Sequence, residues 1–450
     1  MLDKYKLRNT MLDLLNRIEK DSGYSHLLLD NEMKKEQFLK ADRGLLTEVV
    51  YGTIQRKITL DYYLNDFVNP NKKMQPWVRN LLRMSIYQMV YLDRVPAHAI
   101  IHEAVEIAKQ RGHKGIASLV NGVLRNIQRK GVPDTTEISD DIQRLSIETS
   151  HPKWLVERWV NHYGYERTKD ICEANLIHKP ISVRVQPMKL SREQAIDQLR
   201  KEGYQVMPSS FSKQGIIIEK GNILTSDLFQ SGFITIQDQS SMLVGEMLDV
   251  KSGMNVLDTC SAPGGKVTHL AEKMQNEGKI YAHDLHAKKI NLIERKAREL
   301  DLSIIDASCH DARHLSEKYE EESFDRILVD APCSGLGVIR GKPDIKYHKK
   351  SDDIIHLADI QLRILHEVAP LLKKNGLLIY STCTIEPTEN EEVVRNFLHE
   401  HTNYKVDETF FMNLPKQLKE SPGLSDVGLQ LFPQTYETDG FFLTRLKKIN

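Results

Sequence analysis

The sequence predicts a multidomain fold with an all-α N-terminal domain, a small mixed α/β module and a C-terminal α/β domain of the Rossmann-like type. Three observations support this prediction. Apolar residues recur at helical spacing over residues 1–133, short strand-like segments separate helices over 134–245, and strands alternate with helices over 246–450. At about 150 residues per domain, a chain of 450 residues has room for two or three domains.

The N-terminal domain is predicted from four apolar stripes, each with the spacing of one helix face. Strand-like alternation is scarce in this region, so the core is expected to form between helices. The domain is expected to end near Gly131, where a glycine and Pro133 interrupt the helical pattern. The stripes consist of Leu7, Met11, Leu14, Leu15 and Ile18; Leu82, Ile86, Met89 and Val90; Ile101, Ala104, Val105 and Ala108; and Ile116, Leu119, Val120, Val123, Leu124 and Ile127.

The middle module combines both element types. A helix is predicted over Lys153–Tyr163, and alternation predicts a strand over Ile181–Val185. A second helix is predicted over Ser191–Lys201, with its first serine as the N-cap. Two short strands are predicted over Ile216–Ile218 and Phe233–Ile236. The module lacks the aromatic-rich strands of an RNA recognition motif.

The C-terminal domain shows strand–helix alternation, which indicates a parallel sheet covered by helices. Because crossovers between parallel strands are right-handed, the expected fold is doubly wound. The predicted strands are Met254–Asp258, Lys279–Asp284, Ser303–Ile305, Arg326–Asp330 and Leu377–Ser381, and the predicted helices cover 266–275, 286–300 and 352–373.

Residues suited to ligand binding follow these strands, at the edge where open α/β sheets bind ligands. The first strand leads into a glycine-containing loop, 258–266, whose backbone can approach a ligand closely. The loop is not G-x-G-x-x-G, which disfavours a dinucleotide-dependent dehydrogenase. Asp284 ends the second strand and can accept both hydroxyls of a ribose. Asp311, beyond the third strand, can accept from an adenine amino group.

Two cysteines follow the fourth and fifth strands. Cys333 lies three residues beyond Asp330, and Cys383 lies two beyond Ser381, so adjacent strands would bring both thiols to one edge. A thiolate that adds to carbon 6 of a pyrimidine makes carbon 5 nucleophilic toward an electrophilic methyl group. An acid and a base must assist, and the target base must be unpaired or flipped out. The cysteines show no C-x₂-C spacing, so no metal site is expected.

These loops resemble the signature motifs of the S-adenosylmethionine-dependent RNA 5-methylcytosine methyltransferases, the NOL1/NOP2/Sun family. The matching segments are 258–266, 330–335 and 381–384, with flanking likeness at 236–241 and 439–442. The resemblance implies a Rossmann-like methyltransferase domain over 246–450 and S-adenosyl-L-methionine as the cofactor. It also implies transfer of a methyl group to carbon 5 of an RNA cytosine through a covalent cysteine–cytosine intermediate.

The resemblance also implies residue roles. Cys383 would be the nucleophile, Cys333 would assist product release, and Asp330 would lie near the methionine end of the donor and the target base. Asp284 would hold the ribose of the donor and Asp311 its adenine. Spacing does not decide which cysteine attacks, since DNA cytosine methyltransferases use the Pro-Cys cysteine. The loop residues implied to line the donor are Cys260, Ser261, Ala262, Pro263, Gly264, Gly265 and Lys266.

The N-terminal region adds a second resemblance. Val50–Thr53 and Val120–Arg125 resemble the helical fold of the antitermination factor NusB. A NusB-like RNA-binding domain fused to this methyltransferase resembles the layout of bacterial 16S ribosomal RNA methyltransferases, which implies 16S ribosomal RNA as the partner. Two alternatives stay open: a transfer RNA cytosine-5 methyltransferase, and a non-catalytic RNA-binding ribosome assembly factor. Retention of both Cys333 and Cys383 argues against the second.

The charge distribution fits an RNA partner only after the chain is divided. The 62 basic and 62 acidic residues cancel overall, but residues 1–130 hold 22 basic and 14 acidic residues, a net of +8, which leaves −8 for the remainder. Phosphate contacts of this kind would be salt-sensitive. The basic candidates are Arg56, Lys57, Lys72, Lys73, Arg111, Lys114, Arg125, Arg129 and Lys130, and Arg340, Lys342 and Lys346 are expected to steer RNA toward the crevice.

The sequence predicts a cytoplasmic protein without a membrane partner. No apolar run approaches the ~18 residues that span a bilayer. The N-terminus lacks the apolar core of a signal peptide, and five cysteines form no disulfide framework. Cys172 is expected to be structural, and Cys309 has no predicted role.

Overall fold

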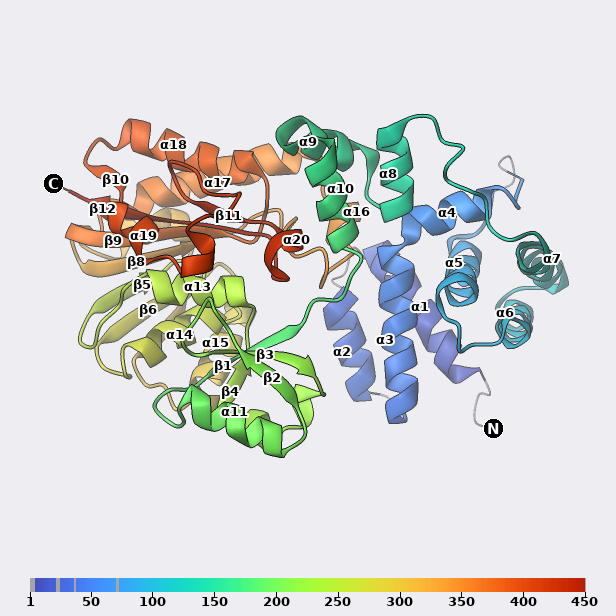
Figure 1. The fold of residues 1–450 in the computed structure, drawn as a ribbon, viewed down its shortest axis with the longest axis horizontal. Coiled ribbons are helices and arrows are strands. Elements are labelled where there is room, and N and C mark those ends of the chain that lie inside the picture. The colour runs from blue at the N-terminus through green and yellow to red at the C-terminus, as the bar shows by residue number, and fades with distance from the viewer. Residues whose placement is uncertain (1–4, 22–24, 36–37, 70–72, 450) are drawn as a thin grey trace. The chain divides into compact units, whose positions relative to one another are not determined.

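The structure is a computed structural model that describes residues 5–21, 25–35, 38–69 and 73–449. Lys72 therefore lies outside the described residues. The chain forms two compact units (Figure 1). The first consists of Met1–Ile177 with Ile339–Lys349, and the second of His178–Val338 with Lys350–Asn450. Each unit has a hydrophobic core of its own.

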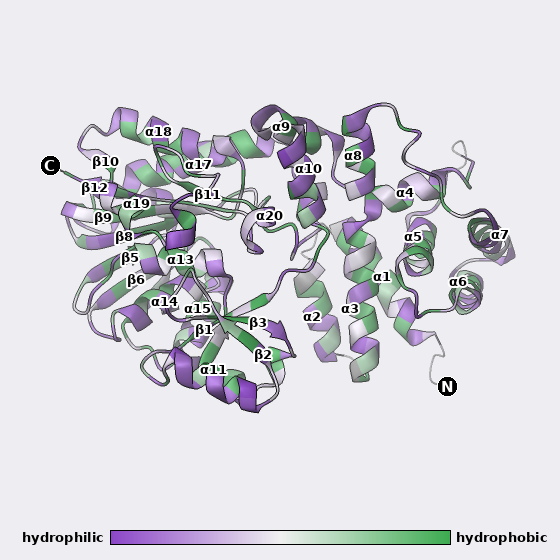
Figure 2. Cartoon of the chain, viewed as in Figure 1, coloured by the Kyte–Doolittle hydropathy of each residue, from purple (hydrophilic) through white to green (hydrophobic). Residues whose placement is uncertain are grey.

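The first unit is built from helices, as the apolar stripes predict. Its central helix, α5, begins with Pro76 in the first turn, where the missing N–H costs no hydrogen bond. Figure 2 shows hydrophobic and hydrophilic residues alternating along the helices of this unit. The helices are α1 (Lys6–Asp21), α2 (Ser25–Lys35), α3 (Lys40–Gln55), α4 (Lys57–Asn65), α5 (Pro76–Tyr91), α6 (Ala97–Arg111), α7 (Lys114–Lys130), α8 (Asp141–Thr149), α9 (Lys153–Tyr163), α10 (Tyr165–Ala174) and α16 (Ile345–His348).

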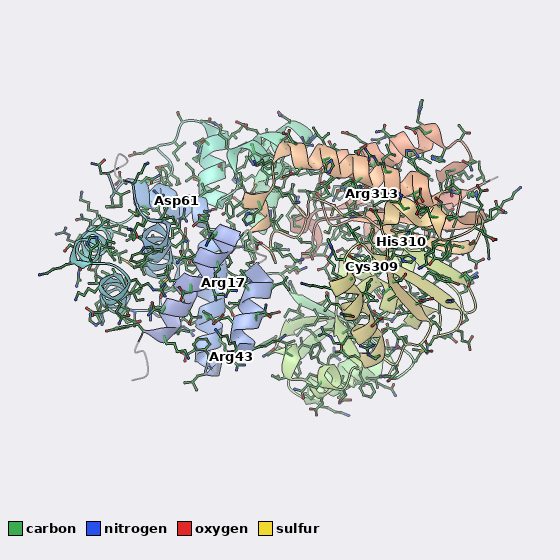
Figure 3. The ribbon with its side chains drawn as sticks, turned by 180° about the vertical axis from the view of Figure 1, so that it is seen from behind. Arg17, Arg43, Asp61, Cys309, His310 and Arg313 are labelled. Carbon is green, nitrogen blue, oxygen red and sulfur yellow. The ribbon has the colours of Figure 1, made fainter. Side chains whose placement is uncertain are left out.

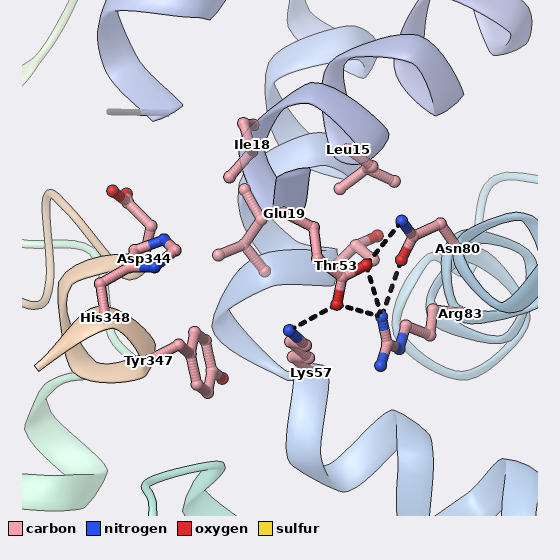
Figure 4. Close-up of a pocket in the computed structure, with 11 residues that line it drawn as sticks. Leu15, Ile18, Glu19, Thr53, Lys57, Asn80, Arg83, Asp344, Tyr347 and His348 are labelled. Carbon is pink, nitrogen blue, oxygen red and sulfur yellow. Dashed lines mark hydrogen bonds and ion pairs between the residues drawn. The ribbon is translucent and has the colours of Figure 1, made fainter. Parts of the chain in front are cut away.

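A network of charged side chains crosses the interior of this unit (Figure 4). The buried Arg83 donates from Nε and Nη2 to the two carboxylate oxygens of Asp61, at 2.9 and 2.7 Å. Glu19 accepts from Lys57 Nζ at 2.7 Å, Arg83 Nη1 at 3.2 Å and Asn80 Nδ2 at 3.0 Å. Burial opposes ionisation of Glu19, but these donors lower its pKa to about 2. The carboxylate is therefore charged at neutral pH.

The cavity drawn in Figure 4 lies beside this network and has a volume of about 40 Å³. Its apolar wall includes Leu15 and Ile18, and its polar wall includes Glu19 and Thr53. That volume has room for a few water molecules but not for a nucleobase. We therefore do not assign the chemistry to this cavity.

Residues 339–349, which follow the Cys333 loop in sequence, belong to the helical unit. Lys346 is fully buried, and its Nζ donates to the carbonyl of Gln55 at 3.0 Å. Burial lowers its pKa to about 7. Arg340 Nε donates to the carbonyl of Ile177 at 3.1 Å. The prediction that Lys346 steers RNA is therefore wrong, because a buried ammonium bound to a carbonyl cannot contact phosphate.

The second unit begins with a small antiparallel sheet in the order β2-β3-β1-β4. Helix α11 (Arg192–Lys201) starts with a capping box in which Ser191 is the N-cap, as expected. β2 was not predicted, because its sequence, Gln-Val-Met-Pro, neither alternates nor forms a continuous apolar run, and only Val206 is buried. The strands are β1 (Ile181–Val185), β2 (Gln205–Pro208), β3 (Gly215–Lys220) and β4 (Ile234–Ile236), and the short helix α12 spans Asp227–Gln230.

The large sheet has the order β10-β12-β9-β8-β5-β6-β7, with β11 paired to β12. Its five strands from β9 to β7 are parallel, and β12 and β10 extend it in the antiparallel sense. The strands are β5 (Asn255–Asp258), β6 (Lys279–Asp284), β7 (Ile305–Cys309), β8 (Phe324–Asp330), β9 (Leu372–Thr382), β10 (Tyr404–Val406), β11 (Leu429–Leu431) and β12 (Phe441–Lys448).

Helices cover both faces of this sheet, which confirms the doubly wound prediction (Figure 1). One face packs on α13 (Gln239–Met247), α14 (Gly265–Lys273) and α15 (Ala287–Glu299). The other packs on α17 (Ser351–Val368) and α18 (Glu391–Glu400). The chain runs from β5 outward to β7 and then returns to β8 on the other side of β5. The strand order therefore reverses between β5 and β8, where ligands bind in such sheets.

Two predicted elements need correction. The third parallel strand is Ile305–Cys309 rather than Ser303–Ile305, because the side chain of Asn276 accepts from the backbone N–H groups of Ser303 and Ile304 before the strand begins. The helix predicted to reach residue 373 ends at Val368, since Leu372 already begins β9. Strand β12 was not predicted, although it is the antiparallel neighbour of β9.

Candidate active site

The two thiols meet at the edge where β8 and β9 end. These strands are parallel neighbours, and Asp330 pairs with Ser381 in register. Beyond them, Cys333 Sγ and Cys383 Sγ lie 3.3 Å apart. The contact with Cys383, together with burial, raises the pKa of Cys333 well above its ordinary value. The predicted convergence of the two cysteines is therefore observed, and Cys333 carries a proton at neutral pH.

Glu389, which the sequence analysis missed, holds the Cys333 loop. It is fully buried and accepts from the backbone N–H of Ser334 at 2.8 Å and from the Ser334 hydroxyl at 2.5 Å. Gln361 Nε2 donates to the same carboxyl group at 3.0 Å. Burial raises the pKa of Glu389. A polar group buried with this many partners fixes one conformation of the loop.

Asn390 supports the Cys383 side in the same way. Its Oδ1 accepts from Thr382 Oγ1 at 2.5 Å, and its Nδ2 donates to the carbonyl of Thr384 at 3.1 Å. The two bonds bracket Cys383 on both sides in sequence. The sequence does show an acid and an amide, Glu389 and Asn390, starting six residues after Cys383. Their contacts with the cysteine loops depend on a turn at Pro387–Glu389 that the spacing of residues does not reveal.

A lysine–aspartate pair lies beside the thiols. Lys266 Nζ is 2.7 Å from Asp330 Oδ2, and Ser381 Oγ donates to Asp330 Oδ1 at 2.9 Å. Burial disfavours the charged form of Lys266, but the charges of Asp330 and Cys383 raise its pKa. The cation also lies 5.2 Å from the centroid of the Phe441 ring. The site thus holds a protonated amine able to stabilise a thiolate or a developing anion.

The glycine-containing loop forms a tight turn between β5 and α14. Gly264 adopts φ +100°, a region that favours glycine, and its N–H donates to the carbonyl of Ser261 at 2.8 Å. The Ser261 N–H donates to the carbonyl of His283 at 2.7 Å. Arg184 of the small module, which is fully buried, donates to the carbonyl of Gly265 at 2.8 Å. The loop is thereby attached to both neighbouring layers.

A cavity of about 220 Å³ opens next to this loop, at the point where the strand order reverses. Of the predicted donor-binding residues, Cys260, Asp284 and Asp311 line it, with Pro332 and Ile360 as apolar wall. Ala262, Pro263 and Gly265 belong to the turn behind it. The combination of carboxylates and an apolar slot suits the hydroxyls and the flat base of a nucleoside.

The two carboxylates of this cavity differ in their surroundings. Asp284 Oδ1 accepts from the backbone N–H of His286 at 3.1 Å, and Lys289 Nζ lies 3.4 Å away. Asp311 already accepts from Arg313 Nε at 3.0 Å and Nη2 at 2.7 Å, which lowers its pKa to about 2. Any contact of Asp311 with an adenine amino group must therefore share the carboxylate with Arg313. Figure 3 shows Arg313 near His310 and the exposed Cys309.

Asp258, at the end of β5, is a second residue whose importance the sequence did not reveal. It is fully buried, and neither carboxylate oxygen makes a hydrogen bond of ordinary geometry among the described residues, although the Ser261 side chain and the Cys260 N–H lie close by and lower its pKa somewhat. Burial and the nearby charge of Asp330 raise its pKa to about 7. A buried acid left unsatisfied beside a ligand cavity is typical of a functional site.

Two of the remaining cysteines have raised pKa values. Cys172 is fully buried in α10, and burial raises its pKa to about 12. Burial likewise raises the pKa of Cys260 to about 12. Over the described ranges, no three His, Cys, Asp or Glu side chains gather as metal ligands would. None of the described helices combines the length and apolarity needed to cross a bilayer.

This fold and this site define an S-adenosylmethionine-dependent RNA methyltransferase. Three family models match the chain: 16S rRNA methyltransferase RsmB/F over residues 246–447, the NusB family over 5–129, and the RsmF/B-like ferredoxin-like domain over 151–224. The chain is 50% identical, over 99% of its length and all of the relative, to the probable ribosomal RNA small subunit methyltransferase B of Bacillus subtilis strain 168. The protein therefore belongs to the RsmB/F family of ribosomal RNA methyltransferases.

Other relatives agree with this membership. The chain is 33% identical to the ribosomal RNA small subunit methyltransferase B of Photorhabdus laumondii over the whole of both chains. Among solved structures, PH0851 has a TM-score of 0.83 at 27% identity and full coverage of both chains. A methyltransferase homologue from Pyrococcus horikoshii has a TM-score of 0.59 at 30% identity, covering 69% of this chain and all of that one.

Proposed function

We propose that this protein methylates carbon 5 of a cytosine in 16S ribosomal RNA through a covalent bond to Cys383. The observation that carries the proposal is the 3.3 Å contact of Cys333 and Cys383 beside the Lys266–Asp330 pair. Two thiols suit a reaction in which one thiol adds to the base and the other assists its elimination. Methyl transfer to an atom that is already nucleophilic would need no thiol. That Cys383 rather than Cys333 attacks rests on the resemblance to the family.

In the first step the Cys383 thiolate forms a bond to carbon 6 of the cytosine. The electron pair of the carbon 5–carbon 6 bond moves to carbon 5, with charge taken up at ring nitrogen 3. Asp330, held by Ser381 and Lys266, can protonate that nitrogen only after it has itself received a proton, and the Lys266 ammonium, 2.7 Å away, is placed to pass one to it. Lys266 is placed to stabilise the thiolate before attack.

In the second step carbon 5 takes the methyl group, which S-adenosylmethionine supplies as an electrophile. A base must then remove the proton from carbon 5 so that the sulfur–carbon 6 bond breaks and the ring double bond returns. Cys333 Sγ, 3.3 Å from Cys383 Sγ, is the side chain we assign to product release. Its own proton has to leave first, because its pKa is raised in the resting site.

The donor is assigned to the cavity at the strand switch point. Asp284 would hold the ribose, Asp311 the adenine, and the loop residues 260–266 the remainder of the donor. The cavity residues fit this assignment, because Asp284 and Asp311 present carboxylate oxygens to hydroxyl and amino donors and Pro332 and Ile360 form an apolar wall for a flat base.

For the substrate we propose an unpaired or flipped cytosine, since a stacked base exposes neither face of carbon 6. We also propose that residues 1–133 form the RNA-binding domain, followed by the small module over 134–245 and the methyltransferase domain over 246–450. The names of the curated relatives support ribosomal RNA of the small subunit. A cytoplasmic location stays a prediction.

Bisulfite sequencing of ribosomal and transfer RNA, with and without the gene, tests the proposal directly. We expect one cytosine of 16S ribosomal RNA to lose protection in the deletion strain and to regain it with the wild-type gene but not with Cys383→Ser. If only a transfer RNA cytosine loses its protection from bisulfite, the protein is a transfer RNA cytosine-5 methyltransferase instead. Unchanged protection in both would favour an assembly factor and contradict the proposal.

A further inference from the structure

Three segments of the second unit meet at Lys179, a residue outside every motif singled out in the sequence. Its Nζ lies 2.5 Å from Asp238 Oδ2 and 2.5 Å from Asp439 Oδ2. The three side chains are 22%, 14% and 15% exposed, in that order. Burial opposes ionisation of Asp238, but Lys179 and neighbouring hydroxyls lower its pKa to about 2. In this Lys179–Asp238–Asp439 cluster, Asp238 is therefore charged throughout the physiological range, and Lys179 is the cation that pairs with it.

Asp238 attaches the C-terminal segment to the start of α13. Its Oδ1 accepts from the backbone N–H of Ser240 at 2.9 Å, as the N-cap of that helix. The same oxygen accepts from the hydroxyl of Thr438, which is fully buried. The backbone N–H of Asp439 donates to it at 3.5 Å. The backbone at 438–439 is thus held in place just before it reaches Gly440.

Gly440 connects this cluster to both cysteine loops. Its N–H donates to the carbonyl of Gly337 at 2.8 Å, four residues beyond Cys333. The N–H of Gly337 in turn donates to the carbonyl of Cys383 at 3.0 Å. A Cβ on Gly337 would lie 1.9 Å from the Gly440 carbonyl oxygen, so this approach is possible only between glycines.

We propose that the Lys179–Asp238–Asp439 cluster positions Cys383 and Cys333 through the two hydrogen bonds Gly440–Gly337 and Gly337–Cys383. The inference rests on the proposed function, in which these two thiols carry out addition and elimination. Covalent attack requires the sulfur within a few tenths of an ångström of its productive place, and a backbone shift of about 1 Å can reduce the rate by about 10²-fold. Lys179 is a positioning residue, because it acts through Asp439 and Gly440.

A second ion pair of the same unit serves as the matched control. Lys273 Nζ lies 2.7 Å from Glu246 Oε2, with side-chain exposures of 24% and 15% that nearly equal those of Lys179 and Asp238. It joins the end of α14 to α13. Among the described residues no hydrogen bond links this pair to either cysteine loop. Loss of this pair should therefore affect stability alone.

The test compares Lys179→Met with Lys273→Met in the full-length protein. For Lys179→Met we expect kcat for methyl transfer to fall by about tenfold or more. The rate at which iodoacetamide alkylates Cys383 should differ from the wild-type rate by a similar factor. The Kd for S-adenosylmethionine should stay within about twofold of wild type. Lys273→Met should keep both rates. Lys179→Arg, which restores the charge, should recover most of kcat. Equal kcat for the two methionine variants would overturn the inference.

A second pair of variants covers the case in which Lys179→Met fails to fold. Asp439→Asn keeps the shape of the side chain but removes its charge, and Glu246→Gln is its control. Reduced kcat with unchanged donor Kd in Asp439→Asn alone supports the positioning role, and equal effects contradict it. The proposed function fails separately, if Cys383→Ser keeps turnover. An inactive Cys383→Ser together with a fully active Asp439→Asn refutes only the positioning role.

Discussion

Glu19 in the helical unit and Asp258 in the second unit are acids in contrasting surroundings. Glu19 accepts from a lysine, an arginine and an asparagine, and its pKa falls to about 2. Asp258 makes no hydrogen bond of ordinary geometry among the described residues, and burial together with the charge of Asp330 raises its pKa to about 7. The helical unit uses charge to stabilise itself, whereas the catalytic edge leaves an acid unsatisfied beside reactive groups. The opposite pKa shifts of these two carboxyl groups therefore distinguish an acid stabilised within an ion-pair network from an acid buried beside reactive groups.

The largest expected effect is the loss of methyl transfer when Cys383, the proposed nucleophile at the catalytic edge, is replaced. Cys383→Ser should reduce methyl transfer by about 10⁴-fold or more, because a hydroxyl is a far weaker nucleophile toward carbon 6. Stability should hardly change, since the side chain is nearly isosteric. Transfer of a labelled methyl group to 16S ribosomal RNA measures the rate. Turnover within tenfold of wild type would contradict the assignment.

The partner thiol should give a different defect. Cys333→Ala is expected to allow addition and methyl transfer but to stall elimination, because the group assigned to release is absent. A complex of protein and RNA that survives denaturation should then accumulate with substrate RNA and donor. Gel electrophoresis detects it, and Cys383→Ser in the same background is the control that should remove it. If Cys333→Ala gives no denaturation-resistant complex of protein and RNA, the assignment of Cys333 to product release is wrong.

Asp258 should make stability fall as the pH rises. Its folded-state pKa of about 7 lies above the unfolded value of about 3.9, so the unfolded state loses its proton first. Between pH 4 and 7, Asp258→Asn should therefore gain stability relative to wild type, by about 4 kcal/mol at the upper end. Urea unfolding followed by circular dichroism at about pH 5 and 7.5 measures this. Parallel profiles for the two proteins would refute the shifted pKa.

Glu19 should show the opposite sign. Its folded-state pKa of about 2 lies below the unfolded value of about 4.3, so its contribution is present above pH 4.3 and is lost as the pH falls through about 2. Since the side chain is 35% exposed, solvent screening limits the cost of Glu19→Gln to about 1 kcal/mol. The three tryptophans, Trp77, Trp154 and Trp159, all lie in the helical unit, so tryptophan fluorescence follows its unfolding selectively. Methyl transfer should not change at neutral pH, and a loss of activity without loss of stability would undo the contrast.

Local patterns were sufficient for most elements of the fold. Helical stripes and strand–helix alternation are visible as periodicity within about ten to twenty residues. The apolar faces that this periodicity defines are the faces that pack in the core. Periodicity failed where a distant side chain intervened, as at Ser303, whose N–H is taken by Asn276. It also failed at β12, because this strand is buried on both faces and its sequence therefore shows no alternation of apolar and polar residues. The sequence likewise placed Lys346 on the surface, because burial of a lysine is decided by helices that lie far away in the chain.

Residues close together in the chain were enough to predict the fold class, the cysteine-bearing loops and the carboxylates at the strand ends. The folded molecule was needed to show that the thiols lie 3.3 Å apart, that Glu389 and Asn390 hold their loops, and that Asp258 makes no hydrogen bond of ordinary geometry. The physical reason is that distance, burial and pKa belong to pairs of groups rather than to single residues. The contact of the two thiols, for example, forms only when the sheet brings segments 50 residues apart to one edge.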